Sequence, residues 1–314
     1  MYSELRSGVF FYDRDNDDVL IRVPDSIEEV ENDNKDKIIF HNVDFSNSQF
    51  SGMHIINRSI SFSNISNWGN KNTFPILSNS RGSVDCINCK NLQLEYPHEI
   101  TYMHIVDCSN CEKINCEKIR ILTFNKTLLN NLDCLVNFDK LIALKLFETE
   151  ITDIDLRGFK NLKVFDISTV KDQRINIKAN NLNRLYCYLT CDYTELNIDC
   201  PSIDNFYIRS KFIVFLKNCS AEIQSLSLDC KFFKHDIDFK KANLQSLDIL
   251  GNASWTPKIL VGDIESIQIR NPDMISNAKS VIPFIDFDDS QRFIFYDSCK
   301  ILNNYSDEKL CVKN

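Results

Sequence analysis

Apolar residues return along most of the chain in a short triplet, apolar-x-x-apolar-x-apolar, about once every 20 residues. The last two apolar positions of each triplet are separated by one residue, and this alternation predicts a short β-strand with one buried face. The triplets are Ile100-Met103-Ile105, Ile119-Leu122-Phe124, Leu141-Leu144-Leu146, Leu162-Phe165-Ile167, Leu182-Leu185-Cys187, Ile203-Phe206-Ile208, Ile223-Leu226-Leu228, Leu244-Leu247-Ile249, Ile264-Ile267-Ile269 and Ile282-Ile285-Phe287. Their middle residues lie 18–22 positions apart, which indicates stacked structural repeats.

A second alternating pair follows most triplets after about ten to twelve residues. The pairs are Ile154/Leu156, Ile175/Ile177, Ile237/Phe239 and Ile259/Val261. These return segments are too short and too rich in β-branched residues for the three-and-four spacing of a helix. We therefore predict an all-β-dominated solenoid with about 20–21 residues per turn and strands on both sides of each turn.

The segment 38–67 has a different period, because an apolar residue recurs there every five positions. The positions are Phe40, Phe45, Phe50, Ile55, Ile60 and Ile65. This segment resembles the pentapeptide-repeat family, in which each five-residue unit forms one side of a square β-helix. The stretch from Leu141 to Leu162 resembles a leucine-rich repeat, and that resemblance extends over about 84–287. Between the two segments, the register of residues 68–99 stays open.

Both ends of a solenoid need caps, since an uncapped end exposes its apolar section and an unpaired strand edge. Two apolar segments, 9–12 and 19–23, flank the polar run Asp13–Asp18 and predict a hairpin, which an acidic linker follows at 25–37. The chain is therefore divided into an N-terminal cap and linker (1–37), pentapeptide-like turns (38–67), a leucine-rich-repeat-like solenoid (68–287) and a C-terminal cap (288–314).

Composition narrows the function. The 36 basic and 44 acidic residues give a net charge of −8, which disfavours a nucleic-acid partner. The seven glycines form no GxGxxG, GxxxxGK[ST] or GxSxG motif, so we expect no catalytic site and no cofactor. Neither a signal peptide nor a membrane span is expected, and the predicted location is the cytoplasm, or a host cell after secretion without a cleaved signal. The thirteen cysteines are accordingly expected as free thiols.

The spacing of four cysteines has two explanations. Cys86-x-x-Cys89 and Cys108-x-x-Cys111 have the spacing of a four-thiolate zinc site. Cys108 also lies five residues after Met103, where leucine-rich repeats place a side chain that satisfies backbone groups at the bend. The same phase is occupied by Thr127, Thr149, Thr190 and Asn252, and also by Cys89 if Val84 begins its strand. The repeat alone accounts for the spacing, so the repeat is favoured over zinc.

The exposed face of the first strands is the candidate binding surface. Its residues flank the last apolar position of each triplet, and the central ones are Lys145, Phe147, Tyr186, Tyr188, Tyr207 and Arg209. Exposed aromatic and arginine side chains on a rigid sheet are typical of interface hot spots, although tyrosine and phenylalanine also simply suit strands. Ten turns at about 4.8 Å give a ridge of about 45 Å, enough for a standard protein interface.

We therefore expect a monomeric module that binds another protein. The combination of the two repeat types resembles effector proteins that enteric bacteria inject into host cells, which implies a host protein as the partner. An enzyme using the neighbouring carboxylates Asp229 and Asp248, or a structural or charge-mimicking solenoid, is the alternative.

Overall fold

The protein is described by a computed structural model in which two compact units divide the chain, Met1–Thr149 and Glu150–Asn314. The structure describes residues 8–12, 20–22, 37–46, 54–56, 59–70, 72–78, 83–95, 99–191, 193–210, 213–219, 221–230, 237–239, 244–250, 259–261, 266–269, 285–286, 293–296 and 310–313. These residues form strands, turns and bends and contain no helix, as the short return segments predict.

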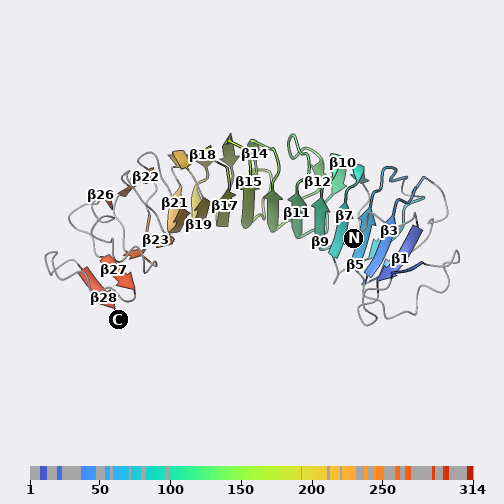
Figure 1. Ribbon diagram of the computed structural model, residues 1–314, viewed down its shortest axis with the longest axis horizontal. Helices are drawn as coiled ribbons and strands as arrows, with labels where there is room; N and C mark the ends of the chain where they lie inside the picture. Colours follow the sequence, from blue (N-terminus) through green and yellow to red (C-terminus); the bar gives the residue numbers. More distant parts are fainter. Residues whose placement is uncertain are drawn as a thin grey trace. The chain divides into compact units, whose positions relative to one another are not determined.

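The first unit is a parallel β-solenoid whose turns begin with a strand of one sheet, here called the front sheet (Figure 1). Its front strands are β3 (Lys37–His41), β5 (Ser59–Ser63), β7 (Ser83–Ile87), β9 (Tyr102–Val106), β11 (Ile121–Asn125) and β13 (Ala143–Phe147). Each pairs in parallel with the next. The return strands are β4 (His54–Ile56) with β6 (Ile76–Ser78), and β8 (Lys90–Leu94), β10 (Ser109–Asn115) and β12 (Leu135–Val136).

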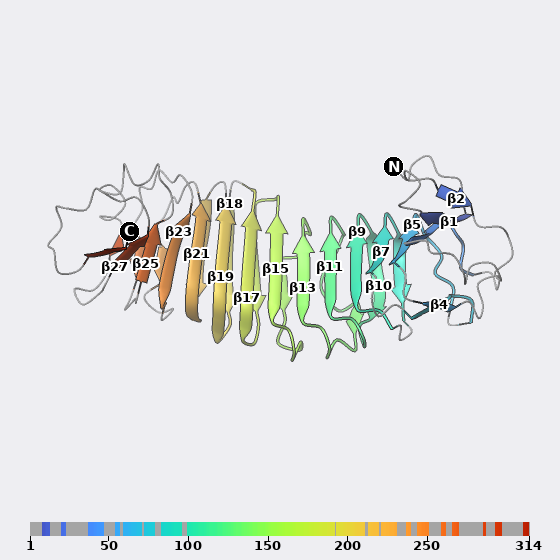
Figure 2. The same cartoon turned by 90° about the horizontal axis from the view of Figure 1, so that it is seen from below.

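The second unit repeats this arrangement, and Figure 2 shows β15 to β23 side by side. Its front strands are β15 (Val164–Thr169), β17 (Leu182–Leu189), β19 (Ser202–Ser210), β21 (Glu222–Cys230), β23 (Ser246–Leu250) and β25 (Ser266–Ile269). One return sheet holds β14 (Asp153–Asp155), β16 (Gln173–Lys178), β18 (Tyr193–Asp199) and β20 (Ile213–Cys219). Another holds β22 (Ile237–Phe239), β24 (Ile259–Val261) and β26 (Ile285–Asp286), and β27 (Phe293–Tyr296) pairs with β28 (Leu310–Lys313).

The triplet pattern locates the front strands correctly within each unit. Met103 pairs with Leu122, Leu185 with Phe206, and Leu226 with Leu247, at offsets of 19, 21 and 21 residues. The tenth triplet is an error, because Ile285 pairs with Ile259 in a return sheet rather than continuing the front sheet. Front and return strands both bury alternate residues, so the pattern alone does not distinguish the two sheets.

The first described turn of the first unit is longer than a square of pentapeptides requires. Four five-residue sides would place Phe40 beside Ile60, but Phe40 pairs with Phe62 and Ile38 with Ile60, an offset of 22 residues. The five-residue period still identifies core positions, since Phe40, Phe45, Ile60 and Ile65 are fully buried. Phe50 lies outside the described residues.

An aromatic cluster fills the core of these early turns. It comprises Phe40, Phe45, Phe62, Trp68 and Phe74, with ring centroids of contacting pairs 4.8–6.4 Å apart. The chain beside it requires glycine: Gly69 has a φ of +64°, and a Cβ there would lie 2.1 Å from the Phe45 carbonyl oxygen.

The N-terminal strands add a hairpin to the first unit. β1 (Gly8–Tyr12) pairs antiparallel with β2 (Leu20–Arg22) and, on its other edge, with β3. The front sheet of this unit therefore ends in an antiparallel β-hairpin, and β1 covers the outer edge of β3. The polar run Asp13–Asp18 lies outside the described residues.

Each front strand of the first unit ends in a left-handed residue that turns the chain toward the return strand. These residues have φ values of 50–56° and are Asn42, Asn64, Asn88, Asp107, Lys126 and Glu148. Asparagine and aspartate tolerate this region better than most residues. The backbone N–H groups of the first five continue the ladder around the bend, as where Asn88 N donates to Val106 O at 2.9 Å. The asparagines also stack, with Asn88 Nδ2 donating to Asn64 Oδ1 at 2.6 Å.

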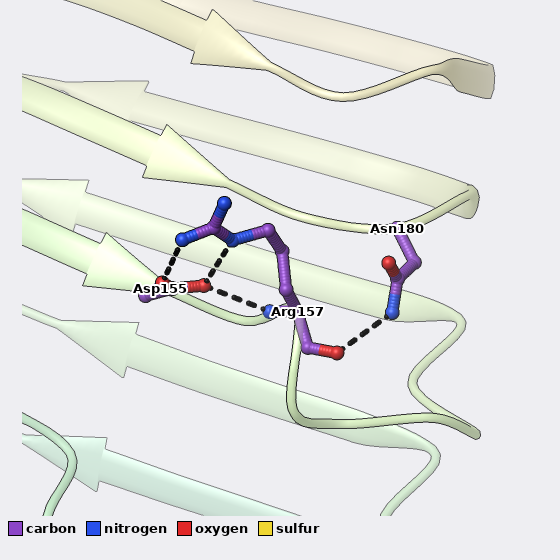
Figure 3. Close-up of polar contacts among 3 residues, drawn as sticks. All are labelled: Asp155, Arg157 and Asn180. Atoms are coloured by element: carbon purple, nitrogen blue, oxygen red, sulfur yellow. Dashed lines mark hydrogen bonds and ion pairs between the residues drawn. The ribbon is translucent and has the colours of Figure 1, made fainter.

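Polar contacts also hold the bends between the return and front strands of the second unit (Figure 3). Asp155 accepts hydrogen bonds from Arg157 Nε at 2.9 Å and Nη2 at 2.5 Å, and also from the Arg157 backbone N–H. One turn later, Asn180 Nδ2 donates to the Arg157 carbonyl at 2.9 Å. The Arg157 hydrogen bonds lower the pKa of the Asp155 carboxyl to about 2.

Candidate functional site

The six residues predicted for the binding surface fall in both units. Lys145 and Phe147 lie half-buried on β13 in the first unit. Tyr186 and Tyr188 on β17, and Tyr207 and Arg209 on β19, belong to the second unit. The candidate site, here called the tyrosine surface, consists of the four residues on β17 and β19 of the second unit: Tyr186, Tyr188, Tyr207 and Arg209.

Strand register brings these four residues together on one face. Tyr186 is paired with Tyr207, and Tyr188 with Arg209. The residues that alternate with them along the two strands point the other way and are buried in the core: Leu185, Cys187, Phe206 and Ile208. Side chains alternate between the two faces of a strand, so the buried core fixes the direction of the tyrosine surface.

The side chains of the tyrosine surface contact one another in an ordered array. The rings of Tyr186 and Tyr207 are stacked, with centroids 4.7 Å apart and planes 15° from parallel. The Arg209 guanidinium lies 5.5 Å from the centre of the Tyr188 ring, within the range of a cation–π interaction. The four side chains of the tyrosine surface are therefore held in contacting pairs, one of two stacked rings and one of a guanidinium over a ring.

Asp229 on β21 anchors this array. Its Oδ2 atom accepts a hydrogen bond from the Tyr207 hydroxyl at 3.3 Å and lies 3.2 Å from Arg209 Nε. Partial burial, followed by the nearby Asp229 charge, raises the pKa of Tyr207 to about 12. The phenol therefore stays protonated at neutral pH and remains a hydrogen-bond donor.

A second ion pair borders the array, and sequence reasoning did not identify it. Arg184 Nε and Nη2 donate to the two carboxylate oxygens of Asp166, at 3.1 and 2.6 Å. Asp166 and Ser168 flank Ile167, at positions where the front-face alternation predicts exposed side chains, but both are buried. The sequence does indicate the position of Arg184: it lies one residue before Leu185, so the alternation places it on the front face with Tyr186.

The carboxylate pair considered for catalysis lies on neighbouring strands. Asp248 on β23 is paired with Ser227, which is two residues before Asp229 on β21. The Asp229 carboxylate accepts the Tyr207 hydrogen bond and forms the ion pair with Arg209, so it stabilises the tyrosine surface.

The cysteines with zinc-like spacing occupy different structural positions. Cys86 faces the core from β7, whereas Cys111 lies on return strand β10. Cys89 and Cys108 stand at the bend, and the Cys89 backbone N–H donates to Cys108 Sγ at 3.3 Å. No group of three or more His, Cys, Asp or Glu side chains that could hold a metal ion occurs among the described residues.

The bend position carries the predicted backbone-satisfying role at some turns but not at Thr149, whose buried Oγ1 atom has no hydrogen-bond partner among the described residues. The Cys108 backbone N–H donates to Thr127 Oγ1 at 3.4 Å, and Thr127 Oγ1 donates to the Ile105 carbonyl at 3.2 Å. In the second unit, Thr190 Oγ1 donates to the Thr169 carbonyl at 3.0 Å. Asn252 lies outside the described residues. Hydrogen bonding to Cys108 together with burial raises the pKa of Cys89, so this thiol is protonated at neutral pH.

No helix in the described part of the chain has the length and hydropathy needed to cross a membrane. Comparison with known proteins adds no relative: no family model, no curated protein and no solved structure matches the chain. The structure therefore identifies the chain as a parallel β-solenoid of stacked repeats, and the candidate site rests on its own geometry.

Proposed function

We propose that the chain is a protein-binding module and that the tyrosine surface contacts its partner. The observation that carries this proposal is the ordered array itself, with Tyr186 stacked on Tyr207 and Arg209 held between the Tyr188 ring and Asp229. Tyrosine and arginine are enriched at the energetic centres of protein interfaces.

Preorganisation supports the proposal. Binding normally costs the conformational freedom of side chains that become fixed at the interface. Here the tyrosines stand on strands whose inward residues Leu185 and Phe206 are buried, and their rings already contact one another. Their remaining freedom is small, so little of the interaction energy is lost in ordering them.

The biological setting proposed for this module follows from the resemblance of its repeats. Leucine-rich-like turns preceded by a pentapeptide-like segment suit an effector that is cytoplasmic in the producing bacterium or acts inside a host cell, on a host protein. This part of the proposal rests on analogy between repeat types, since a fold does not specify a function. The tyrosine surface is a separate ground for protein binding and does not depend on the setting.

The proposal is tested by affinity capture with the full chain, from lysates of the producing organism and of candidate host cells. Tyr188→Ala, Tyr207→Ala and Arg209→Ala are each compared with Gln268→Ala on β25, a front strand three places beyond β19 in the sheet. We expect the captured partner to bind each of the first three variants more weakly by more than about 1 kcal/mol, and the Gln268→Ala control with unchanged affinity.

Stability must be measured beside affinity, because Tyr207 packs on Tyr186. Removing one ring of such a pair costs about 0.5–1.5 kcal/mol beyond its buried area. A folded variant with reduced affinity supports the proposal. Equal affinity of wild type and all three variants for the partner would place the contact surface elsewhere on the chain.

A further inference from the structure

The two ion pairs of this face share one arrangement, with the arginine outside and the carboxylate beneath it. The Arg184 side chain is 48% exposed, whereas that of its partner Asp166 is 6% exposed. The Arg209 side chain is 55% exposed and that of its partner Asp229 is 28% exposed. The chain has a net charge of −8, but the charged groups presented to solvent beside the stacked tyrosines are therefore guanidinium groups.

Both guanidinium groups keep hydrogen-bond donors for a ligand. A guanidinium carries five N–H donors, and Arg184 uses two of them on Asp166. Arg209 approaches Asp229 through Nε and also interacts with the Tyr186 hydroxyl. The remaining donors suit a carboxylate, which binds arginine through two parallel hydrogen bonds.

The third carboxylate of the face does not oppose this arrangement. Asp248 is half-buried on β23, two strands beyond Arg209, in register with Ser227. An acidic ligand is therefore favoured over β17 and β19 and disfavoured over β23.

The separation of the two arginines matches an extended peptide. Arg184 on β17 pairs with Asn205 on β19, and Arg209 lies four residues after Asn205 on β19. At about 3.3 Å per residue and 4.8 Å per strand, their Cα atoms are about 14 Å apart. In an extended partner, residues i and i+4 share one face at about 13 Å, and residue i+2 falls between them, over the Tyr186–Tyr207 stack.

We propose that the tyrosine surface, together with Arg184, binds an extended acidic protein segment with carboxylates at positions i and i+4 and an apolar side chain at i+2. This inference rests on the proposed function and names the class of partner. The carboxylates pair with Arg184 and Arg209, and the apolar side chain packs on the tyrosine stack. Charge complementarity at both ends fixes the position of the segment along the strands.

The test is a display selection of random twelve-residue peptides on the full chain, followed by fluorescence anisotropy with the enriched sequences. We expect enrichment of acidic-x-apolar-x-acidic patterns. Arg184→Gln and Arg209→Gln are each expected to weaken binding about tenfold, the size of a charged hot-spot contact. Exchange of each peptide Glu for Gln should weaken binding to the wild-type protein by a similar factor. This arm does not depend on how well the variants fold.

Arg174→Gln is the matched control. Arg174 forms the same kind of pair on return strand β16, with Nε 3.1 Å from Glu195, and the two side chains are 59% and 8% exposed. Peptide affinity should be unchanged within about twofold in this variant, since a surface charge away from the contact contributes little. The unfolding midpoints of Arg174→Gln and Arg184→Gln also show whether loss of an arginine over a buried carboxylate affects the fold itself.

The outcomes separate this inference from the proposed function. Enriched peptides that are basic or uncharged, but lose affinity on Tyr188→Ala, overturn the acidic segment and leave the tyrosine surface as the binding site. Peptides that are indifferent to both the tyrosine and the arginine variants contradict both proposals. Absence of any enriched sequence, or acidic peptides equally weakened by Arg174→Gln, overturns the inference.

Discussion

Replacement of Cys108 by valine is expected to destabilise the first unit, although valine is apolar and similar in size. The Sγ atom of this buried residue accepts the Cys89 backbone N–H at 3.3 Å. Valine has no acceptor, so a buried N–H would lose its partner. The Val106 carbonyl near Cys108 Sγ is less affected, because it still accepts the Asn88 backbone N–H at 2.9 Å.

The size of the effect follows from the group that is left unpaired. A buried donor without a partner costs about 1–3 kcal/mol, and sulfur is a weak acceptor, so the lower half of this range is expected. Cys108→Thr should avoid the cost, because Thr127 already serves the next turn in this way, accepting the Cys108 N–H and donating to the Ile105 carbonyl. Threonine and valine differ only by hydroxyl against methyl, so their difference isolates the hydrogen bond.

The assay is urea unfolding of both variants, combined with hydrogen exchange at the Cys89 amide, because repeat arrays can lose two-state cooperativity. Cys116 provides the control. It is equally buried, but among the described contacts its sulfur accepts no backbone N–H, so valine there should be no worse than threonine. Equal stability of Cys108→Val and Cys108→Thr, with equal protection of the Cys89 amide, would refute the role assigned to the bend.

Three further predictions concern the fold. Burial raises the pKa of Cys116 to about 12 and those of Cys134 and Cys200 to about 11, above the usual thiol value of about 8.5. Thermal stability should therefore be constant between about pH 6 and 8 and fall between pH 8.5 and 11, since the unfolded chain releases protons that the folded chain keeps. An unchanged midpoint at pH 10 would contradict this. Gly69→Ala should lower the unfolding midpoint strongly, because residue 69 has a left-handed φ and an added Cβ would clash with the Phe45 carbonyl. Gly158→Ala, at an exposed turn, is the control and should not lower the midpoint. Similar midpoints for the two variants would refute the clash. At Asn88, with φ of 52°, valine should be about 1–2 kcal/mol less stable than glycine in urea unfolding, and equal stability would argue against the left-handed bend.

Much of the fold could be predicted because a solenoid repeats one packing problem. Each front strand buries alternate residues against the same core, so residues such as Leu185 and Phe206 return at the turn length and reveal strand, face and period together. The pattern does not distinguish front strands from return strands where both bury alternate residues. Ile285 shows this, since a return strand buries alternate residues as a front strand does.

The candidate site was only partly predictable, for a different physical reason. Tyr186, Tyr188, Tyr207 and Arg209 were found because they follow the front-face alternation. The ion pair between Arg184 and Asp166 depends on a long side chain reaching diagonally to the neighbouring strand, and no period in the sequence encodes that reach. Burial of Asp166 follows from this contact and could not be inferred from its position on the strand.

The most direct test of the account is hydroxyl-radical footprinting of the full chain with and without its captured partner. The account predicts that oxidation of Tyr188 and Tyr207 falls in the complex, while Tyr102, exposed on a front strand of the first unit, is oxidised equally in both states. Unchanged oxidation of Tyr188 and Tyr207, together with protection of any other surface, would show that the partner does not bind the tyrosine surface.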